Sequence, residues 1–302
     1  MGNCYQRAPN LNRGQQKLIA GRYQQSCTPW NSSNIAKNRI ASTEVRRWER
    51  LQCVGNSPCD RSGHGSIILG SKAYVFGGCG GPAANGTCLR DFYCFDLETL
   101  EWQRIRGTGE APSARASFSM NPGADDGTII IAGGTGDQNE GLQGDVFEFN
   151  VHTQHWRKLA DQEACGEESF CQYYGQSMVQ YKGALVFFGG STGTQYTNAT
   201  FRFDPESQQV EQLQTTGQPP SPRYKHQALV VGRHMYIFGG GNYKPPTDRI
   251  DVHRLDLDTL VWEPVLTHGP RPPARVAHSC VLDAEAGRVY LWGGFTATLE
   301  RL

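Results

Sequence analysis

The sequence predicts an all-β fold, a β-propeller of four-stranded blades, from two periodic markers. Glycine pairs close short apolar runs at five places, spaced 56, 56, 50 and 54 residues apart. These pairs are Gly77-Gly78, Gly133-Gly134, Gly189-Gly190, Gly239-Gly240 and Gly293-Gly294. A second series, spaced 54, 54, 54 and 52 residues apart, consists of Trp48, Trp102, Trp156, Val210 and Trp262. Repeats of about 50 residues with four short strands are typical of propeller blades.

The strands within each repeat are short, apolar or alternating, and bounded by turn residues, and none has a helical period. Between the glycine pair and the tryptophan stands a turn of the form Asp/Asn-x-x-Thr/Ser-x-x-Trp. It begins at Asp96, Asn150, Asp204 and Asp256. The side chain of Asp or Asn can accept a hydrogen bond from the backbone two residues further on. Val210 departs from the tryptophan pattern, so we expect looser packing in that blade.

In chain order, residues 1–44 are expected to be a disordered basic tail and residues 45–302 the propeller. Blades are expected at about 61–106, 115–160, 172–214 and 223–266, and a fifth opens at residue 275. The strand around Trp48 resembles an outer strand that closes the ring. Either 297–302 forms a third strand and Trp48 a fourth, which gives five blades, or the chain is a truncated form of a six-bladed protein. The early end favours truncation.

The composition excludes several classes of protein. The 302 residues include 29 basic and 29 acidic ones, so the formal net charge is zero and we expect no nucleic-acid partner. No apolar run approaches the length of a membrane span. Ten cysteines occur without a Cys-x-x-Cys pair, and no secretory signal opens the chain. We therefore expect reduced thiols and a cytoplasmic location, with the nucleus as the other open location.

The first four residues, Met1-Gly2-Asn3-Cys4, suggest myristoylation at Gly2 with palmitoylation at Cys4. The motif requires Ser or Thr at position 6, where this chain has Gln6. The alternative is a solvated basic tail. We expect contact with a membrane only if the N-terminus is lipidated.

Arginine recurs where the first strand of a blade begins. The four residues are Arg61, Arg115, Arg223 and Arg275. Equivalent positions of a propeller lie at one height, so we expect these guanidiniums to ring one mouth of the channel and to bind a carboxylate or phosphate. The alternative is structural, with each arginine bound to backbone or to an aspartate of the next blade.

The third blade differs from the others at this position. Gln172 replaces the arginine, so Tyr173 and Tyr174 face a peptide whose carboxylate lies toward Arg223 and Arg275. Tyr224 completes the candidate peptide-binding set. The linker from Trp156 to Gln172 has 16 residues, against 13 in the other blades, and is a candidate binding loop.

Nothing in the sequence supports catalysis, since no nucleophile elbow or metalloprotease motif occurs. We expect a non-enzymatic protein without a cofactor. Three blades carry a histidine after the strand-opening arginine, at His64, His226 and His278. These rings are expected to bond backbone within their blades, since residues of separate blades seldom converge on one metal ion.

The glycine pair, the aromatic strand and the outer tryptophan together resemble the kelch family over residues 45–302. Two stretches are similar to one kelch subgroup: residues 174–241, with Arg223-Tyr-Lys-His, and residues 274–280, Ala-Arg-Val-Ala-His-Ser-Cys. That resemblance implies a substrate receptor of a cullin-2 ubiquitin ligase, whose propeller mouth binds C-terminal glycine degrons. It also implies elongin B and C as partners, bound through a helical box after the propeller, which this sequence does not contain. The alternative is a scaffold that binds cytoskeletal or trafficking proteins through its blade loops.

Overall fold

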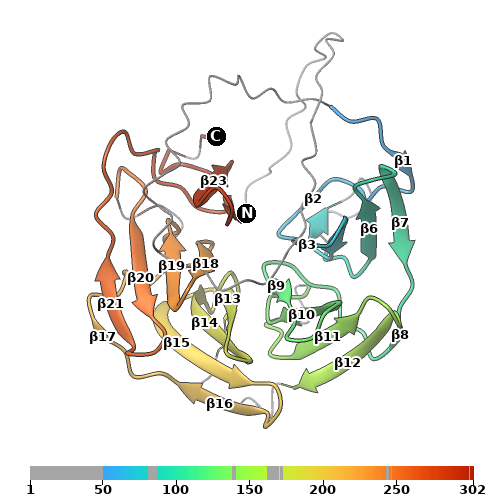
Figure 1. Cartoon of the computed structure of the whole chain (residues 1–302), viewed down its shortest axis with the longest axis horizontal. Helices are drawn as coiled ribbons and strands as arrows, with labels where there is room; N and C mark the ends of the chain where they lie inside the picture. The colour runs from blue at the N-terminus through green and yellow to red at the C-terminus, as the bar shows by residue number, and fades with distance from the viewer. Residues whose placement is uncertain are drawn as a thin grey trace.

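The computed structural model describes residues 50–80, 87–137, 141–161, 170, 173–242, 245, 247–298 and 300–302. Its β-sheets stand radially around one axis and follow one another in chain order (Figure 1). All regular elements of the described part are strands, which confirms the all-β propeller. Among these residues no helix is long and apolar enough to cross a membrane.

Four blades are complete, each with four antiparallel strands running from the axis outwards. The first contains β3 (Gly65–Leu69), β4 (Lys72–Phe76), β6 (Phe92–Asp96) and β7 (Glu101–Ile105). The second contains β9 (Ser119–Pro122), β10 (Thr128–Ala132), β11 (Val146–Asn150) and β12 (His155–Ala160). The third contains β13 (Ser177–Tyr181), β14 (Ala184–Ser191), β15 (Tyr196–Asp204) and β16 (Gln209–Gln212). The fourth contains β18 (Gln227–Val231), β19 (His234–Phe238), β20 (Val252–Asp256) and β21 (Val261–Pro264).

Short strands complete the sheets. Three two-residue strands pair in parallel with the outer strands: β1 (Val54–Gly55) with β7, β8 (Thr108–Gly109) with β12, and β17 (Thr216–Gly217) with β21. In the first blade, β2 (Arg61–Ser62) pairs with β5 (Cys79–Gly80). A fifth blade is represented by β22 (Ser279–Asp283) and β23 (Arg288–Trp292).

Of the two alternatives for the fifth blade, a third strand over residues 297–302 is not formed by the described residues. The chain turns back directly after the glycine pair, since Arg301 pairs with Phe295 and the Thr296 N–H donates to the Glu300 carbonyl. The equivalent pair in the second blade, Thr135 with Leu142, belongs to the loop before the third strand. Trp48, Gly2, Cys4 and the tail lie outside the described residues.

Glycine pairs permit close contact between blades. Gly77 and Gly78 have positive φ angles of 60° and 91°. The Gly78 N–H donates to the Arg115 carbonyl of the next blade at 2.8 Å. A Cβ on Gly77 would lie 2.7 Å from that carbonyl oxygen. Any other residue at Gly77 would therefore push the two blades apart.

A belt of backbone hydrogen bonds joins the blades where the innermost strands begin. It runs through Gly63, Ser117, Gly175, Lys225 and Ala277. Each N–H from Ser117 onward donates to the carbonyl of the preceding member, at 2.7–2.9 Å. All five residues have φ between 52° and 68°, a region that disfavours side chains. We call these five residues the belt.

The turn before each outer strand has the predicted geometry. Asp96 Oδ1 accepts hydrogen bonds from the backbone N–H groups of Glu98 and Thr99, at 2.9 and 3.0 Å. Asn150, Asp204 and Asp256 accept the same two bonds in their blades. The side chain thus ends one strand and directs the chain into the outer strand.

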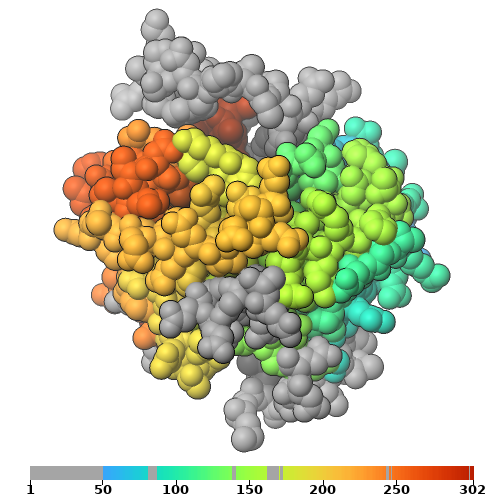
Figure 2. All heavy atoms as spheres, turned by 90° about the horizontal axis from the view of Figure 1, so that it is seen from below, coloured from blue at the N-terminus to red at the C-terminus, as the bar shows by residue number. Residues whose placement is uncertain are grey.

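The outer tryptophan packs between blades, and the third blade uses a different ring. In the second blade the Trp156 ring lies 5.4 Å from Phe92 of the first blade and 4.7 Å from Phe149. Where the third blade has Val210, Phe170 from the long linker is fully buried and stacks on Phe187 at 3.8 Å. This ring replaces the packing that Val210 was expected to lose. The side view shows the second blade (green) directly against the third (yellow; Figure 2).

Candidate functional site

The strand-opening arginines lie inside the blades. Arg223 is 1% exposed, and its Nε donates to the Ser221 carbonyl at 3.0 Å. Its Nη1 donates to the Gly239 carbonyl at 2.7 Å, and the two Nη atoms bind both carboxylate oxygens of Asp251 at 3.0 and 2.8 Å. Arg223 therefore ties the start of the innermost strand to the third strand of the same blade.

Two further blades repeat this ion pair, Arg61 with Asp91 and Arg115 with Asp145. Burial alone would lower the pKa of Arg61, but the hydrogen bonds and charge of Asp91 raise it. Burial alone would raise the pKa of Asp91, yet Arg61 holds it below its ordinary value. A charge removed from water needs such a partner, so both groups stay ionised.

The expectation of guanidiniums exposed around the mouth is therefore corrected. The structural alternative describes these side chains better, with one difference, because the aspartate comes from the same blade and not from the next. Contact of any of these arginines with a peptide stays a prediction.

Arg275, in the fifth blade, differs from the other three. It donates to the carbonyls of Pro273 and Gly293, at 3.1 and 3.0 Å. No carboxylate among the described residues pairs with it. Burial lowers the pKa of Arg275, whereas that of Arg61 is raised. Of the four strand-opening arginines, Arg275 is thus the one whose guanidinium still has N–H groups without an acceptor in the described chain.

The third blade has a different register from the one predicted. Tyr174 pairs with Ser191 as Tyr224 pairs with Gly241, so Tyr173 stands where Arg223 stands. Gln172, which we expected there, lies outside the described residues. The ring of Tyr173 packs on the core, 6.3 Å from Phe201. Of the two predicted tyrosines, only Tyr174 joins Tyr224.

A cluster of three tyrosines and one lysine lies where the innermost strands of the third and fourth blades begin. The Tyr224 ring is 5.9 Å from Tyr174, edge to face, and 5.3 Å from Tyr196. Lys225 Nζ lies 5.1 Å from the centre of the Tyr224 ring. We call Tyr174, Tyr196, Tyr224 and Lys225 the mouth cluster.

Lys225 is a half-buried cation, and none of the described carboxylates forms an ion pair with it. Desolvation by burial lowers the pKa of its ammonium group. Sequence reasoning missed this residue, although a signal was present. At the belt position the other blades have Gly63, Ser117, Gly175 and Ala277, so Lys225 is the one long side chain in its register.

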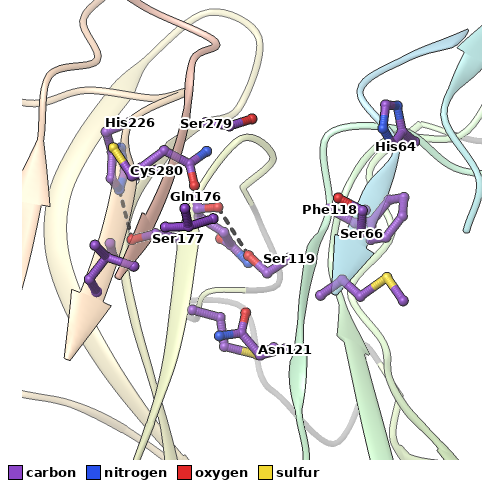
Figure 3. Close-up of a pocket in the computed structure, with 17 residues that line it drawn as sticks. His64, Ser66, Phe118, Ser119, Asn121, Gln176, Ser177, His226, Ser279 and Cys280 are labelled. Carbon is purple, nitrogen blue, oxygen red and sulfur yellow. Dashed lines mark hydrogen bonds between the residues drawn. The ribbon is translucent and has the colours of Figure 1, made fainter. Parts of the chain in front are cut away.

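The innermost strands of all five blades enclose a channel, a cavity of about 310 Å³. Figure 3 shows serine, asparagine, glutamine and histidine side chains pointing toward it. The Ser119 hydroxyl donates to the Gln176 carbonyl at 3.0 Å, and His226 Nε2 lies 2.8 Å from Ser177 Oγ. His226 thus forms a hydrogen bond with the neighbouring blade. We had expected a hydrogen bond with the backbone of its own blade instead. Burial, with the charge of Arg223, lowers the pKa of His226 to about 3, so its ring is neutral at pH 7.

These histidines are not assembled around a metal ion. Among the described residues no three His, Cys, Asp or Glu side chains are grouped closely enough to hold one. The channel therefore offers hydrogen-bonding groups, and the cation of the mouth cluster lies outside the residues that line it.

Comparison with known proteins gives the family. A model described as the KLHDC2/KLHL20/DRC7 Kelch-repeats domain matches residues 31–166, 79–248 and 225–302. Kelch domain-containing protein 10 of Xenopus laevis is 31% identical over 85% of this chain and 63% of that protein. The chain belongs to the Kelch-repeat family. It spans only 56–63% of the length of the frog and human Kelch domain-containing protein 10.

Other proteins match as well. The human Kelch domain-containing protein 10 is 30% identical over 79% of this chain. Acyl-CoA-binding domain-containing protein 5 of Arabidopsis thaliana is 30% identical over 82% of the chain but only 38% of that protein. Similar sequences therefore occur in proteins with different names, and membership of the Kelch-repeat family is consistent with a protein-interaction scaffold.

Proposed function

We propose that this Kelch propeller is a non-enzymatic protein-interaction scaffold that binds the C-terminal end of a partner peptide at the mouth of its channel. The observation that carries the proposal is Lys225, a half-buried cation beside Tyr224 for which the described chain provides no carboxylate. A partly desolvated ammonium is costly until it pairs with an anion. A peptide carboxylate supplies that anion.

The surrounding residues suit the last side chains of such a peptide. Tyr174 and Tyr224 stand edge to face, and each combines a large apolar ring with a polar tip. Arg223 acts indirectly, because its ion pair with Asp251 fixes the segment that carries Tyr224 and Lys225.

The finer proposal is that the chain is a substrate-recognition subunit of a cullin-2 ubiquitin ligase, with elongin B and C as partners and the cytoplasm as its location. Its support is the similarity to Kelch domain-containing protein 10 and the kelch resemblance of residues 174–241. A terminal glycine is the peptide end that the resemblance to this kelch subgroup implies.

Peptide binding is tested by fluorescence anisotropy with peptides that end in glycine, as free acids and as matched amides. A charged hydrogen bond contributes about 1.5–3 kcal/mol, so Lys225→Met and amidation should each weaken binding about tenfold to a hundredfold. Lys182→Met is the control, since Lys182 is exposed and pairs with Asp258. Equal binding of acid and amide would contradict the proposal.

The ligase assignment needs a separate measurement. Affinity purification of the chain from cells tests this assignment, and enrichment of elongin B, elongin C and cullin-2 would support it. Enrichment of actin or a small GTPase without these subunits would favour the cytoskeletal or trafficking scaffold. Peptide binding and ligase assembly can therefore fail independently.

A further inference from the structure

Two cysteines of the first blade lie in contact across an antiparallel pair. Cys79 follows the Gly77-Gly78 pair, and Cys88 lies opposite it in an isolated β-bridge. Their Sγ atoms are 3.0 Å apart. The Leu89 N–H donates to the Gly78 carbonyl at 2.8 Å, which fixes the two backbones side by side.

We propose that Cys79 and Cys88 form a reversible disulfide, which makes this cysteine pair a site of oxidative modification. Opposite residues of an antiparallel pair have Cα atoms about 4.5–5.5 Å apart, within the range of about 4.4–6.8 Å that disulfides use. The sulfurs need to approach by about 1 Å to reach bonding distance. Rotation about the side-chain bonds is enough for that.

The two thiols have different surroundings, which sets the order of the reaction. Cys79 is partly exposed, so a small oxidant in solution reaches its sulfur. Cys88 is 7% exposed, and burial and Cys79 raise the pKa of its thiol. Its backbone N–H donates to Asp137 Oδ1 at 2.7 Å, and its Sγ lies 3.7 Å from the Thr135 carbonyl. Both partners belong to the second blade.

The oxidant is a low-molecular-weight disulfide such as oxidised glutathione. The Cys79 thiolate attacks it, forming a mixed disulfide and releasing one glutathione thiolate. Cys88 then loses its proton and attacks Cys79 Sγ, which releases the second glutathione. Two protein thiols are oxidised to one disulfide, and one oxidised glutathione is reduced to two thiols. Reduced glutathione reverses both steps.

Other described cysteines are not placed for this reaction. Cys53, Cys59, Cys94 and Cys280 are free, and Cys94 and Cys280 are buried. No other pair of described cysteines has its sulfurs in contact. In a reducing compartment a disulfide is a transient, sensing bond and not a permanent one.

The sequence provides a direct test with its own control. Trypsin cleavage after Lys72 and Arg90 releases 73–90, which contains Cys79 and Cys88 and no other cysteine. Cleavage after Arg50 and Arg61 releases 51–61, which contains Cys53 and Cys59. The full-length folded chain is equilibrated with mixtures of reduced and oxidised glutathione, alkylated, digested and weighed by mass spectrometry.

As the mixture becomes more oxidising, the doubly alkylated form of 73–90 should fall at least tenfold. An unalkylated form two hydrogens lighter than the dithiol should replace it, while 51–61 keeps its labels or gains glutathione. In Cys88→Ser, glutathione should remain on Cys79, since no second thiol can expel it. The proposal is overturned if 73–90 keeps both labels throughout, or if 51–61 closes at the same ratio.

Discussion

The third and fourth blades have different residues at the position of the buried arginine–aspartate pair and at the outer tryptophan. In the fourth, Arg223 and Asp251 form a buried ion pair and Trp262 packs from the outer strand. In the third, Tyr173 stands in place of the arginine, and the strand register puts Ala199 in place of the aspartate. Both members of the pair have changed together. An apolar pair can thus occupy the site, provided that no charge is left alone in it.

The largest expected effect comes from leaving one charge of the fourth-blade pair alone. Arg223→Ala should lower the free energy of unfolding by about 3–5 kcal/mol, because Asp251 is left without its partner. Urea unfolding measures the loss. The double variant Arg223→Ala with Asp251→Ala should recover part of it. If the single and double variants are equally unstable, the carboxylate is not the source of the cost.

In the third blade the corresponding weak point is Phe170. Its buried ring stacks on Phe187 beside Val210, so Phe170→Ala should cost about 3–5 kcal/mol through the cavity that it leaves. The matched variant adds Val210→Trp, which restores an outer-strand tryptophan. Partial recovery of the melting temperature is expected. An unchanged melting temperature in Phe170→Ala would show that the third blade does not depend on this ring.

The sequence predicted those features whose cause is local. The Asp96-type turns depend on backbone within a few residues and have the expected geometry. The sequence left the structural role of Arg223 open as an alternative but did not identify its partner, because Asp251 lies 28 residues away and becomes a neighbour only through the fold. The register of Tyr173 was misplaced by one residue, since the lengthened linker removes the fixed spacing from Trp156.

The boundary between the two blades predicts a pH effect. His226 packs on Phe188, and burial, with Arg223 and His278, lowers its pKa to about 3. An unfolded histidine titrates near pH 6.5. Between about pH 6.5 and pH 3 the unfolded chain therefore binds a proton that the folded chain does not bind. The contribution of His226 to the free energy of unfolding is therefore fully present above pH 6.5. It falls as the pH drops toward 3, by about 1.4 kcal/mol per pH unit.

His278 adds a second contribution, because burial lowers its pKa to about 4. Urea unfolding at pH 7.5, 6 and 5 measures the combined slope. His226→Gln keeps a hydrogen-bonding group near Ser177 without a titrating ring and should reduce that slope by about one proton. A slope unchanged by this substitution would contradict the assignment to His226.

The substitution with the smallest expected effect on the free energy of unfolding tests peptide binding separately from the fold. At the belt the third blade has Gly175, with φ of 65°, and the fourth has Lys225, with φ of 52°. A side chain in this region costs about 1–2 kcal/mol, and the added freedom of glycine in the unfolded chain returns about 0.5–1 kcal/mol. Lys225→Gly should therefore leave the free energy of unfolding unchanged or raise it by up to about 1 kcal/mol.

The same substitution removes the cation of the mouth cluster, so peptide binding should weaken about tenfold to a hundredfold while the fold is kept. Ala277→Gly is the matched control, because its φ of 54° is relieved in the same way but no charge is removed. Its stability should rise equally and its peptide affinity should stay at the parent value. If Lys225→Gly binds the free-acid peptide with the affinity of the parent chain, Lys225 does not bind the peptide carboxylate. If it unfolds the chain, the belt requires that side chain and the strain argument fails.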